Sequence, residues 1–256
     1  MNAKPQTVSL DDERIIPGQT DPATYQSHLA RYHFALRWVM PGDDVLETAC
    51  GSGYGTKLLA GRAKTVLATD YSPLAIGYAR HHFPASNLAF AVMDCQQMAL
   101  RASSFDVIVS FEVFEHLEDA AAYLSQCKQV LRPGGRLLLS TPNRATHDLH
   151  MRSIGRDNDF HINLMDSRRF VSFIQSYFPD SQVYGQRRRG NWLYGALRAA
   201  DVFNLRLRLV SAKRREHIQE SFGVAPLQSE ATLDSWAFTP RQLRQANNFV
   251  AVCRKA

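Results

Sequence analysis

The sequence lacks several features that define other classes of protein. No apolar run approaches the ~18 residues that a membrane-spanning helix needs. Residues 1–10 lack the basic-then-apolar pattern of a secretory signal. The four cysteines lie far apart and form no Cys-x-x-Cys pair, so neither a zinc site nor a disulfide framework is indicated. They are Cys50, Cys95, Cys127 and Cys253. These absences favour a protein of the reducing cytoplasm.

A glycine-rich stretch, VLETACGSGYGT (45–56), joins an apolar strand pattern to a helical one. Gly51 and Gly53 lack a Cβ, so the backbone can adopt positive φ there and a ligand can lie directly against it. The Gly-Lys-Ser/Thr of a phosphate-binding loop is missing, and Thr56 stands where a dinucleotide fingerprint has its third glycine. The strand ends in Glu47, whose carboxylate disfavours a pyrophosphate but suits an ammonium or sulfonium group.

A second acidic residue ends the next expected strand, 65–70. The carboxylate of Asp70 can accept two hydrogen bonds from a ribose 2′,3′-diol, as an acidic residue about 20 positions after a glycine loop does. Together with Glu47 and the glycines, it predicts that the ligand is S-adenosylmethionine.

Five stretches, in this order and spacing, resemble the class I S-adenosylmethionine-dependent methyltransferases. They are VLETACGSGYGT, LATDYSPLAIGYAR, VMDCQQM, FDVIVSFEVFEHLED and LRPGGRLLLSTPN. Within that family the chain is most similar to bacterial small-molecule O-methyltransferases, over about residues 11–180 and again at the last strand. The resemblance implies an α/β, Rossmann-like sheet of seven strands in the order 3-2-1-4-5-7-6. The last strand is antiparallel, helices cover both faces, and a helical insertion separates strands 6 and 7.

This architecture implies three segments. Residues 1–40 form an N-terminal lid and helix, residues 41–189 and 249–256 form the S-adenosylmethionine-binding methyltransferase domain, and residues 190–248 are an inserted cap or lid. The insertion mixes apolar residues with arginines and lysines. We expect a helical lid packed on the core, while contact with an anionic membrane and dimerisation are the alternatives.

The resemblance places cofactor contacts at the expected strand ends and on the helix before the first strand. These residues are Glu47, Ala49, Gly51, Gly53, Asp70, Tyr71, Asp94, Cys95, Phe111 and Arg31. The Arg31 guanidinium suits the methionyl carboxylate of the cofactor, and the alternative is a solvated arginine beside a core stripe. The resemblance implies that Asp94 contacts the adenine amine, and a role in capping the following turn is compatible with this.

The chemistry is expected after the strand 105–111. Glu112, Glu115 and His116 share one face if the segment there is helical. Among the nine histidines, His161 is the preferred candidate for acceptor contact or proton removal, and we predict that Glu115, His116 and His161 are catalytic. The E-x-x-E-H pattern resembles that of the ubiquinone-pathway O-methyltransferases, where such residues have a metal role. No further acidic ligand is evident nearby, so the sequence favours a reaction without metal, with magnesium as the alternative.

The predicted reaction transfers a methyl group from S-adenosylmethionine to an oxygen of a small-molecule or glycan-like acceptor. Base-methylating enzymes place Asn/Asp-Pro-Pro-Tyr/Phe where this chain has residues 110–113, Ser-Phe-Glu-Val, which argues against DNA and makes RNA an unfavoured acceptor. The net charge of +6 permits an anionic acceptor without requiring nucleic acid. The alternatives are an N-methyltransferase of a small amine or RNA, and a non-catalytic partner protein that binds S-adenosylmethionine.

Overall fold

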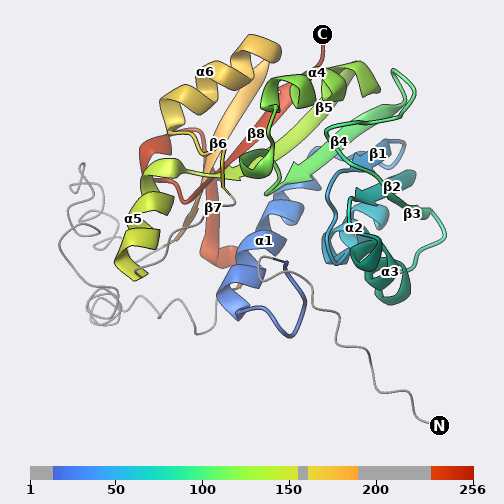
Figure 1. Ribbon diagram of the computed structural model, residues 1–256, viewed down its shortest axis with the longest axis horizontal. Coiled ribbons are helices and arrows are strands. Elements are labelled where there is room, and N and C mark those ends of the chain that lie inside the picture. Colours follow the sequence, from blue (N-terminus) through green and yellow to red (C-terminus); the bar gives the residue numbers. More distant parts are fainter. Residues whose placement is uncertain (1–13, 155–160, 190–231) are drawn as a thin grey trace.

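The computed structural model of the protein describes residues 14–154, 161–189 and 232–256. They form one eight-stranded sheet in the order β3-β2-β1-β4-β5-β8-β6-β7 (Figure 1). The strands are β1 (Asp44–Glu47), β2 (Thr65–Asp70), β3 (Leu88–Val92), β4 (Phe105–Phe111), β5 (Leu131–Pro142), β6 (Ser181–Arg188), β7 (Trp236–Thr239) and β8 (Asn248–Arg254). Strands β1 to β5 are parallel, and β8 pairs antiparallel with both β5 and β6.

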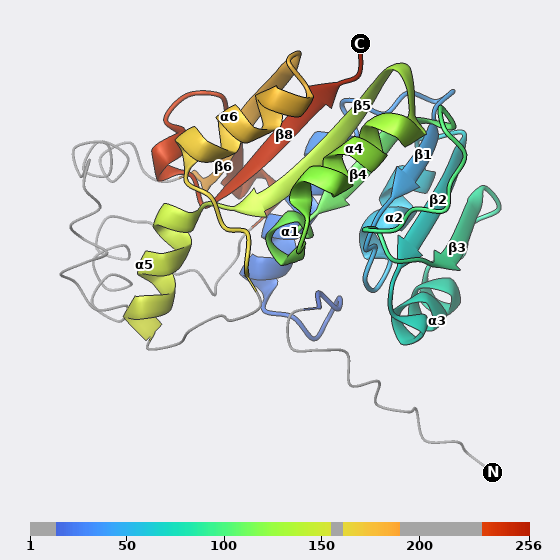
Figure 2. The same cartoon turned by 45° about the horizontal axis from the view of Figure 1, so that its top comes forward.

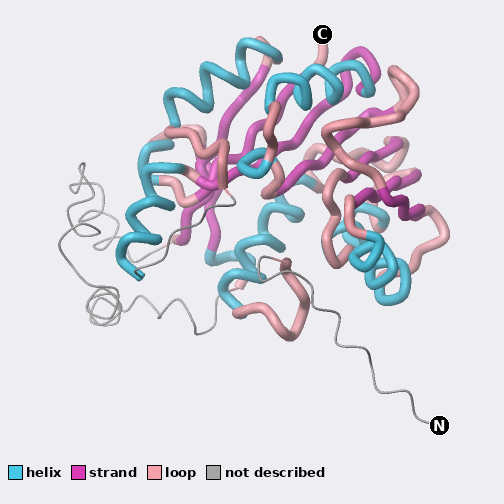
Figure 3. The backbone as a smooth tube through the Cα atoms, viewed as in Figure 1, coloured by secondary structure: helices cyan, strands magenta, loops and turns pink. Residues whose placement is uncertain are grey.

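Helices cover both faces of the sheet (Figures 2 and 3). They are α1 (Pro22–Ala35), α2 (Tyr54–Ala60), α3 (Pro73–His82), α4 (Ala120–Val130), α5 (Arg144–Ile154) and α6 (Ser167–Tyr177), with short 3-10 helices η1 (Phe114–His116), η2 (Leu233–Ser235) and η3 (Leu243–Gln245). Within the described ranges, none of these helices has the length and apolar character that crossing a lipid bilayer requires.

The two faces arise from alternation along the strands. Val45 packs in the core layer of α1 and α2, whereas Leu46, the next residue of β1, packs in the layer of α4 and α6. Val107 and Ile108 of β4 divide in the same way. Successive side chains of a strand point to opposite faces, so a strand that is apolar throughout must be covered on both.

Side-chain caps begin helices α1, α3, α4 and, at Asp166, α6. Asp21 accepts a hydrogen bond from the Thr24 amide at 2.8 Å at the start of α1, and proline follows it at the first helical position. Ser72 caps α3 in the same way, and Asp119 caps α4. Each cap satisfies an amide that has no partner within its own helix, which fixes where the helix begins.

The sheet has one strand more than the seven expected from the sequence. The expected seventh strand is β8, and the additional strand, β7, pairs antiparallel with β6 at the edge of the sheet. Phe238 of β7 stacks on Phe34 of α1 with ring centroids 4.6 Å apart. The end of the inserted segment is therefore a strand and not a helix, because these apolar residues complete the layer over α1. The lid or membrane role predicted for residues 190–231 lies outside the described residues.

The close packing of α1 on α2 depends on a glycine. A Cβ on Gly55 would lie 2.0 Å from Cζ of Tyr32, which is buried and donates a hydrogen bond to Glu47 at 2.7 Å. Tyr32 cannot move aside without losing that hydrogen bond. The third glycine of the loop thus serves helix packing, which the sequence pattern alone does not reveal.

Gly55→Ala should therefore lower the free energy of unfolding by roughly 1–3 kcal/mol, the usual cost of overpacking. Gly77→Ala is the matched control, since Gly77 lies on the exposed face of α3 and a Cβ there meets nothing within 4 Å. It should leave stability unchanged or raise it by up to about 1 kcal/mol. Urea unfolding of the two variants checks this, and equal effects would contradict the packing argument.

Candidate active site

The site lies where the strand order reverses, at the carboxyl ends of the neighbouring strands β1 and β4. In open α/β sheets, ligands bind in the crevice outside the strand ends at such a point. Ala49, just after β1, has φ +51°, and Glu112, just after β4, has φ +55°. Residues other than glycine rarely adopt this left-handed conformation, which costs about 1–3 kcal/mol and clusters at active sites. The two left-handed residues therefore lie at the same strand ends where the strand order predicts a ligand site.

Gly51 and Gly53 have different roles in the loop after β1. Gly51 has φ +55°, and a Cβ built on it meets no atom within 4 Å, so its outer side is open to a ligand. Gly53 has φ +84°, and its Cβ would lie 2.7 Å from the Cβ of Ala79 in α3. The first glycine therefore leaves room for a ligand, whereas the second lets the start of α2 approach α3.

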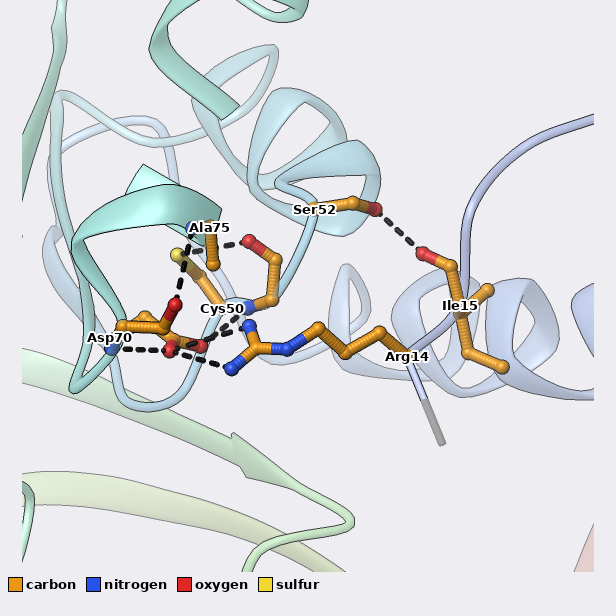
Figure 4. Close-up of polar contacts among 8 residues, drawn as sticks. Arg14, Ile15, Cys50, Ser52, Asp70 and Ala75 are labelled. Carbon is orange, nitrogen blue, oxygen red and sulfur yellow. Dashed lines mark hydrogen bonds and ion pairs between the residues drawn. The ribbon is translucent and has the colours of Figure 1, made fainter. Parts of the chain in front are cut away.

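Asp70, at the end of β2, is fixed beside this loop. Its Oδ2 accepts a hydrogen bond from the Gly51 amide at 2.9 Å, and its Oδ1 accepts one from the Ser72 amide at 3.0 Å. The carboxylate is 2% exposed, and the Arg14 guanidinium contacts its Oδ1 at 3.3 and 3.4 Å (Figure 4). Asp70 therefore lies where the sequence predicts a ribose ligand, held by two backbone amides.

Arg14 is a site residue that the sequence reasoning missed. Its guanidinium also lies over the ring of Tyr71, 5.5 Å from the ring centroid. The Ser52 hydroxyl donates a hydrogen bond to the carbonyl of Ile15 at 2.6 Å, which ties this N-terminal segment to the glycine loop (Figure 4). A single arginine next to an apolar pair has no local pattern that would predict such a contact.

Glu47 lies behind the glycine loop and is 1% exposed. Its Oε1 accepts a hydrogen bond from the Tyr32 hydroxyl at 2.7 Å, and its Oε2 accepts one from the Thr56 hydroxyl. Burial, together with the neighbouring Asp70, raises the pKa of Glu47 to about 7 against the opposing effect of these hydrogen bonds. Both oxygens of Glu47 thus have hydrogen-bond partners within the protein.

Arg31 of α1 is buried at 1% exposure, so the alternative of a solvated arginine is wrong. Its Nη1 donates a hydrogen bond to Oε1 of Gln186 at 2.7 Å, and its Nη2 lies 3.5 Å from Oε2 of Glu112. Its Nε and Nη2 have no hydrogen-bond acceptor among the described residues. A buried guanidinium with two such nitrogens has donors left for a carboxylate ligand.

The side chain of Glu112 is bound by residues other than Glu115 and His116. Its Oε1 accepts a hydrogen bond from the Ser140 hydroxyl at 2.7 Å, and its Oε2 accepts one from the Asn248 side chain at 2.8 Å. The segment after β4 forms only the short helix η1, which begins at Phe114. The shared helical face expected for the three residues therefore does not form, because Glu112 lies before the helix in a left-handed conformation.

Glu115 and His116 are instead joined by His161. One possible ligand atom of each lies within 4.8 Å of the others. The amide of Asn163 donates a hydrogen bond to the carbonyl of Glu115 at 2.9 Å, which holds the segment around His161 against η1. His147 of α5 joins them, since its Nε2 lies 3.1 Å from Nδ1 of His161. We call these four residues the histidine cluster.

Burial governs the charges of the histidine cluster. It raises the pKa of Glu115 well above its usual value, and the nearby Glu112 raises it further. Partial burial, with His116 and His147 close by, lowers the pKa of His161 to about 4. Oε2 of Glu115 is buried and has no hydrogen-bond partner among the described residues. The sequence alone did not single out His147 as a site residue.

The other predicted contacts lie along the same edge of the sheet. Tyr71 is 65% exposed, as a ring that covers a ligand can be. Asp94 is exposed after β3, and its Oδ1 accepts a hydrogen bond from the Gln96 amide at 2.8 Å, so the expected turn cap is confirmed. Cys95 is half-buried beside it. The ring of Phe111 packs on Tyr32 with centroids 5.2 Å apart.

Comparison with known proteins identifies the relatives of the chain. Residues 46–139 match the family model described as "Methyltransferase domain". A probable S-adenosylmethionine-dependent methyltransferase of Mycolicibacterium smegmatis is 35% identical over 178 residues. These residues make up 68% of this chain and 66% of that protein, so the chain spans just under two thirds of the relative's length.

Two further proteins are similar over different shares of the chain. The ubiquinone biosynthesis O-methyltransferase of Cereibacter sphaeroides is 34% identical over 115 residues, which are 44% of this chain and 47% of that protein. The N-methyltransferase NodS of Bradyrhizobium japonicum, solved in complex with S-adenosylhomocysteine, superposes with a TM-score of 0.55 at 18% identity. That superposition covers 93% of this chain and 89% of that one, and shows a shared fold.

The position of Asp70 predicts its effect on cofactor affinity. Asp70→Ala should weaken the binding of S-adenosylhomocysteine by roughly 30 to 150-fold, because losing charge-assisted hydrogen bonds costs about 2 to 3 kcal/mol. Asp180→Ala is the control, since the exposed Asp180 lies before β6 at the opposite edge of the sheet. Calorimetry checks both variants, and wild-type affinity in a folded Asp70→Ala protein would remove Asp70 from the cofactor site.

The raised pKa of Glu47 predicts how stability varies with pH. A carboxyl whose folded pKa rises from 4.5 to about 7 stabilises the fold below pH 4.5, and this contribution is lost as the pH rises through 7. The loss is on the order of 3 kcal/mol. Glu47→Gln cannot titrate, so the wild type should lose more unfolding free energy than this variant between pH 5 and pH 8. The exposed Glu118→Gln is the control, and parallel urea-unfolding profiles of wild type and Glu47→Gln would contradict the assignment.

Proposed function

Because the chain belongs to the class I S-adenosylmethionine-dependent methyltransferases, we propose that it methylates an oxygen of a small-molecule or glycan-like acceptor. The observation behind this proposal is the histidine cluster, which lies at the end of β4, next to the strand that leads into the glycine loop. A binding site for the methyl donor and a set of polar groups for an acceptor thus lie at one edge of the sheet. The likeness to an O-methyltransferase of ubiquinone biosynthesis supports oxygen as the acceptor atom.

The residues at this edge fit S-adenosylmethionine, the cofactor of the family. The open side of Gly51 leaves a cradle against the backbone, and Asp70 offers carboxylate oxygens to a ribose diol. We assign Arg31 to the methionyl carboxylate, since two of its buried nitrogens have no hydrogen-bond acceptor among the described residues. Glu47 contributes negative charge behind the loop.

The remaining predicted contacts complete this assignment. Asp94 and the amide of Cys95 are placed to bind the adenine, and the exposed ring of Tyr71 is placed to cover the nucleoside. Ala49 follows β1 and Phe111 ends β4, and we assign the backbone of both residues to the cofactor. Each of these residues lies at the carboxyl end of β1, β2, β3 or β4.

The chemistry requires alignment and the removal of one proton. The acceptor oxygen forms a bond to the methyl carbon while the carbon–sulfur bond breaks, the bonding pair stays on sulfur, and the hydroxyl proton is lost. Holding two reactants in line is worth several orders of magnitude in rate, and a placed base adds typically 10²–10⁴-fold. We assign Glu115, His116 and His161 to the acceptor side, where they orient the hydroxyl and assist the loss of its proton.

The same residues argue against a non-catalytic cofactor-binding protein. A protein that only binds the cofactor has no need of the polar histidine cluster, with its buried carboxylate, beside the cofactor loop. The four cysteines are free, which supports the proposal that the protein works in the reducing cytoplasm. A homodimer and a lid role for the inserted segment remain predictions.

The nature of the acceptor is tested with methyl-labelled S-adenosylmethionine. A catechol, a methyl glycoside, a polyamine and transfer RNA are offered separately to the full chain. We expect label on the oxygen of the catechol or the glycoside, because the cluster provides groups that accept a hydroxyl proton. Label confined to the polyamine would support the N-methyltransferase alternative, and label confined to RNA, or none, would contradict the proposal.

The role of the cluster is tested with the hydroxyl acceptor found in that experiment. His161→Ala should lower turnover on the order of 100-fold or more, with the affinity for S-adenosylhomocysteine unchanged. His33→Ala is the matched control, since His33 is exposed on α1. Full activity in His161→Ala would remove His161 from the catalytic residues.

A further inference from the structure

We propose that Gln186 of β6 is a positioning residue of the cofactor site, which aims the Arg31 guanidinium at the methionyl carboxylate without cancelling its charge. Gln186 is buried at 0% exposure, and its Oε1 accepts a hydrogen bond from Nη1 of Arg31 at 2.7 Å. Three strands separate β6 from β1 in the sheet, so this support comes from far outside the glycine loop. The inference rests on the assignment of Arg31 in the proposed function, and its test measures ligand binding without any acceptor.

The orientation of the Gln186 amide is determined by its second partner. Its Nε2 donates a hydrogen bond to the carbonyl of Ser27 at 2.8 Å and lies 3.2 Å from the Ser27 hydroxyl. A backbone carbonyl can only accept, so the nitrogen of the amide faces Ser27 and its oxygen faces Arg31. Ser27 and Arg31 are four positions apart on α1 and therefore lie on one face of that helix. Gln186 thus binds two successive turns of α1.

The backbone of Gln186 is held by its neighbours in the sheet. In the antiparallel pairings of β6 it lies opposite Asn248 of β8 on one side and Phe238 of β7 on the other. Its carbonyl also accepts a hydrogen bond from the Asn247 amide at 2.9 Å. A residue between two paired strands is a more rigid support than a residue on a loop. The amide therefore presents Arg31 with an acceptor in a fixed place.

The bond to Gln186 decides which part of the Arg31 guanidinium is left for a ligand. The guanidinium is planar and its donors form a rigid fork, so a partner for Nη1 sets the direction of the other nitrogens. The remaining two, Nε and Nη2, are buried and have no hydrogen-bond acceptor among the described residues. They form one edge of the group, from which two parallel hydrogen bonds can run to a carboxylate.

The neutral charge of Gln186 matters as much as its position. The one carboxylate that the structure places near the guanidinium belongs to Glu112, 3.5 Å from Nη2, within the described part of the chain. That carboxylate already accepts hydrogen bonds from Ser140 and Asn248. A buried charge is costly unless it is paired and hydrogen-bonded. Because an amide orients Arg31 without supplying a second negative charge, the site keeps its attraction for the carboxylate of a ligand.

The test compares two ligands of the purified full chain by calorimetry. S-Adenosylhomocysteine carries the methionyl-type carboxylate, whereas 5′-methylthioadenosine has the same nucleoside and sulfur but lacks the amino-acid end. Gln186→Leu should weaken S-adenosylhomocysteine about 10 to 100-fold, in line with the loss of a hydrogen bond to a charged group, and leave 5′-methylthioadenosine unchanged. Gln182→Leu is the matched control, because Gln182 is exposed four positions earlier on the same strand. It should bind both ligands as the wild type does.

Two further variants separate positioning from a structural role. Gln186→Glu keeps the shape of the side chain, but its carboxylate compensates the guanidinium and faces the Ser27 carbonyl. It should also weaken S-adenosylhomocysteine and leave 5′-methylthioadenosine unchanged, which keeps the inference testable if Gln186→Leu does not fold. Arg31→Met should weaken S-adenosylhomocysteine at least as much as Gln186→Leu does. Adding Gln186→Leu to Arg31→Met should have no further effect, because Gln186 acts through Arg31.

The outcomes against the inference are equally definite. Equal weakening of both ligands in the Gln186 variants would show a merely structural role, and wild-type affinity of Gln186→Glu for S-adenosylhomocysteine would remove the need for a neutral residue. A further loss when Gln186→Leu is added to Arg31→Met would show that Gln186 does not act through Arg31. Each of these results would leave methyl transfer to oxygen standing. Conversely, the expected ligand pattern in a chain that transfers no label to any hydroxyl would overturn the proposed function alone.

Discussion

The buried carboxylate of Glu47 is the constraint on which the rest of the site depends. It accepts hydrogen bonds from Tyr32 of α1 and from Thr56 of α2 at the end of β1. A carboxylate buried at this depth is costly unless hydrogen bonds satisfy it, so α1 and α2 must approach each other closely enough to supply both donors. Gly55 permits that approach, because any side chain there would overlap the Tyr32 ring.

The position of α1 also determines what Arg31, the residue before Tyr32, can contact. Arg31 lies beside Tyr32 in the sequence, and its guanidinium reaches Gln186 of β6 and Glu112 after β4. One helix thus connects the glycine loop, the end of β4 and the far half of the sheet. If α1 shifted, the cofactor loop and the end of β4 would lose their common support. The sheet positions the strands, but α1 sets the geometry between the donor and acceptor sides.

The sequence correctly predicted the features of the fold that depend on local residue patterns and on the order of helices and strands. The strand from Phe105 to Phe111 has the predicted bounds, and the order of the first five strands follows from the resemblance. Asp70 lies at a strand end beside the glycine loop, as its spacing from that loop predicted. These features are recoverable because parallel strands with helical crossovers bring all their carboxyl ends to one edge.

The sequence could not predict contacts between distant segments. The guanidinium of Arg31 meets a side chain 155 positions away, and no periodicity along α1 separates a buried arginine from a solvated one. His147 and His161 lie 14 positions apart across residues outside the described ranges, and neither has a local motif. The strand β7 has four residues, too few for alternation to distinguish it from a loop.

The carboxylates of the site differ in the hydrogen-bond partners that the protein gives them. Asp70 is held by two backbone amides and contacted by the Arg14 guanidinium. Glu112 is held by two side-chain donors with Arg31 beside it, so it is satisfied within the protein. Glu115 has neither kind of partner for its buried oxygen and faces imidazoles instead. Burial and the nearby Glu112 therefore raise the pKa of Glu115 against the smaller opposing effect of Arg31, so this carboxyl favours its neutral form more than an exposed glutamate does.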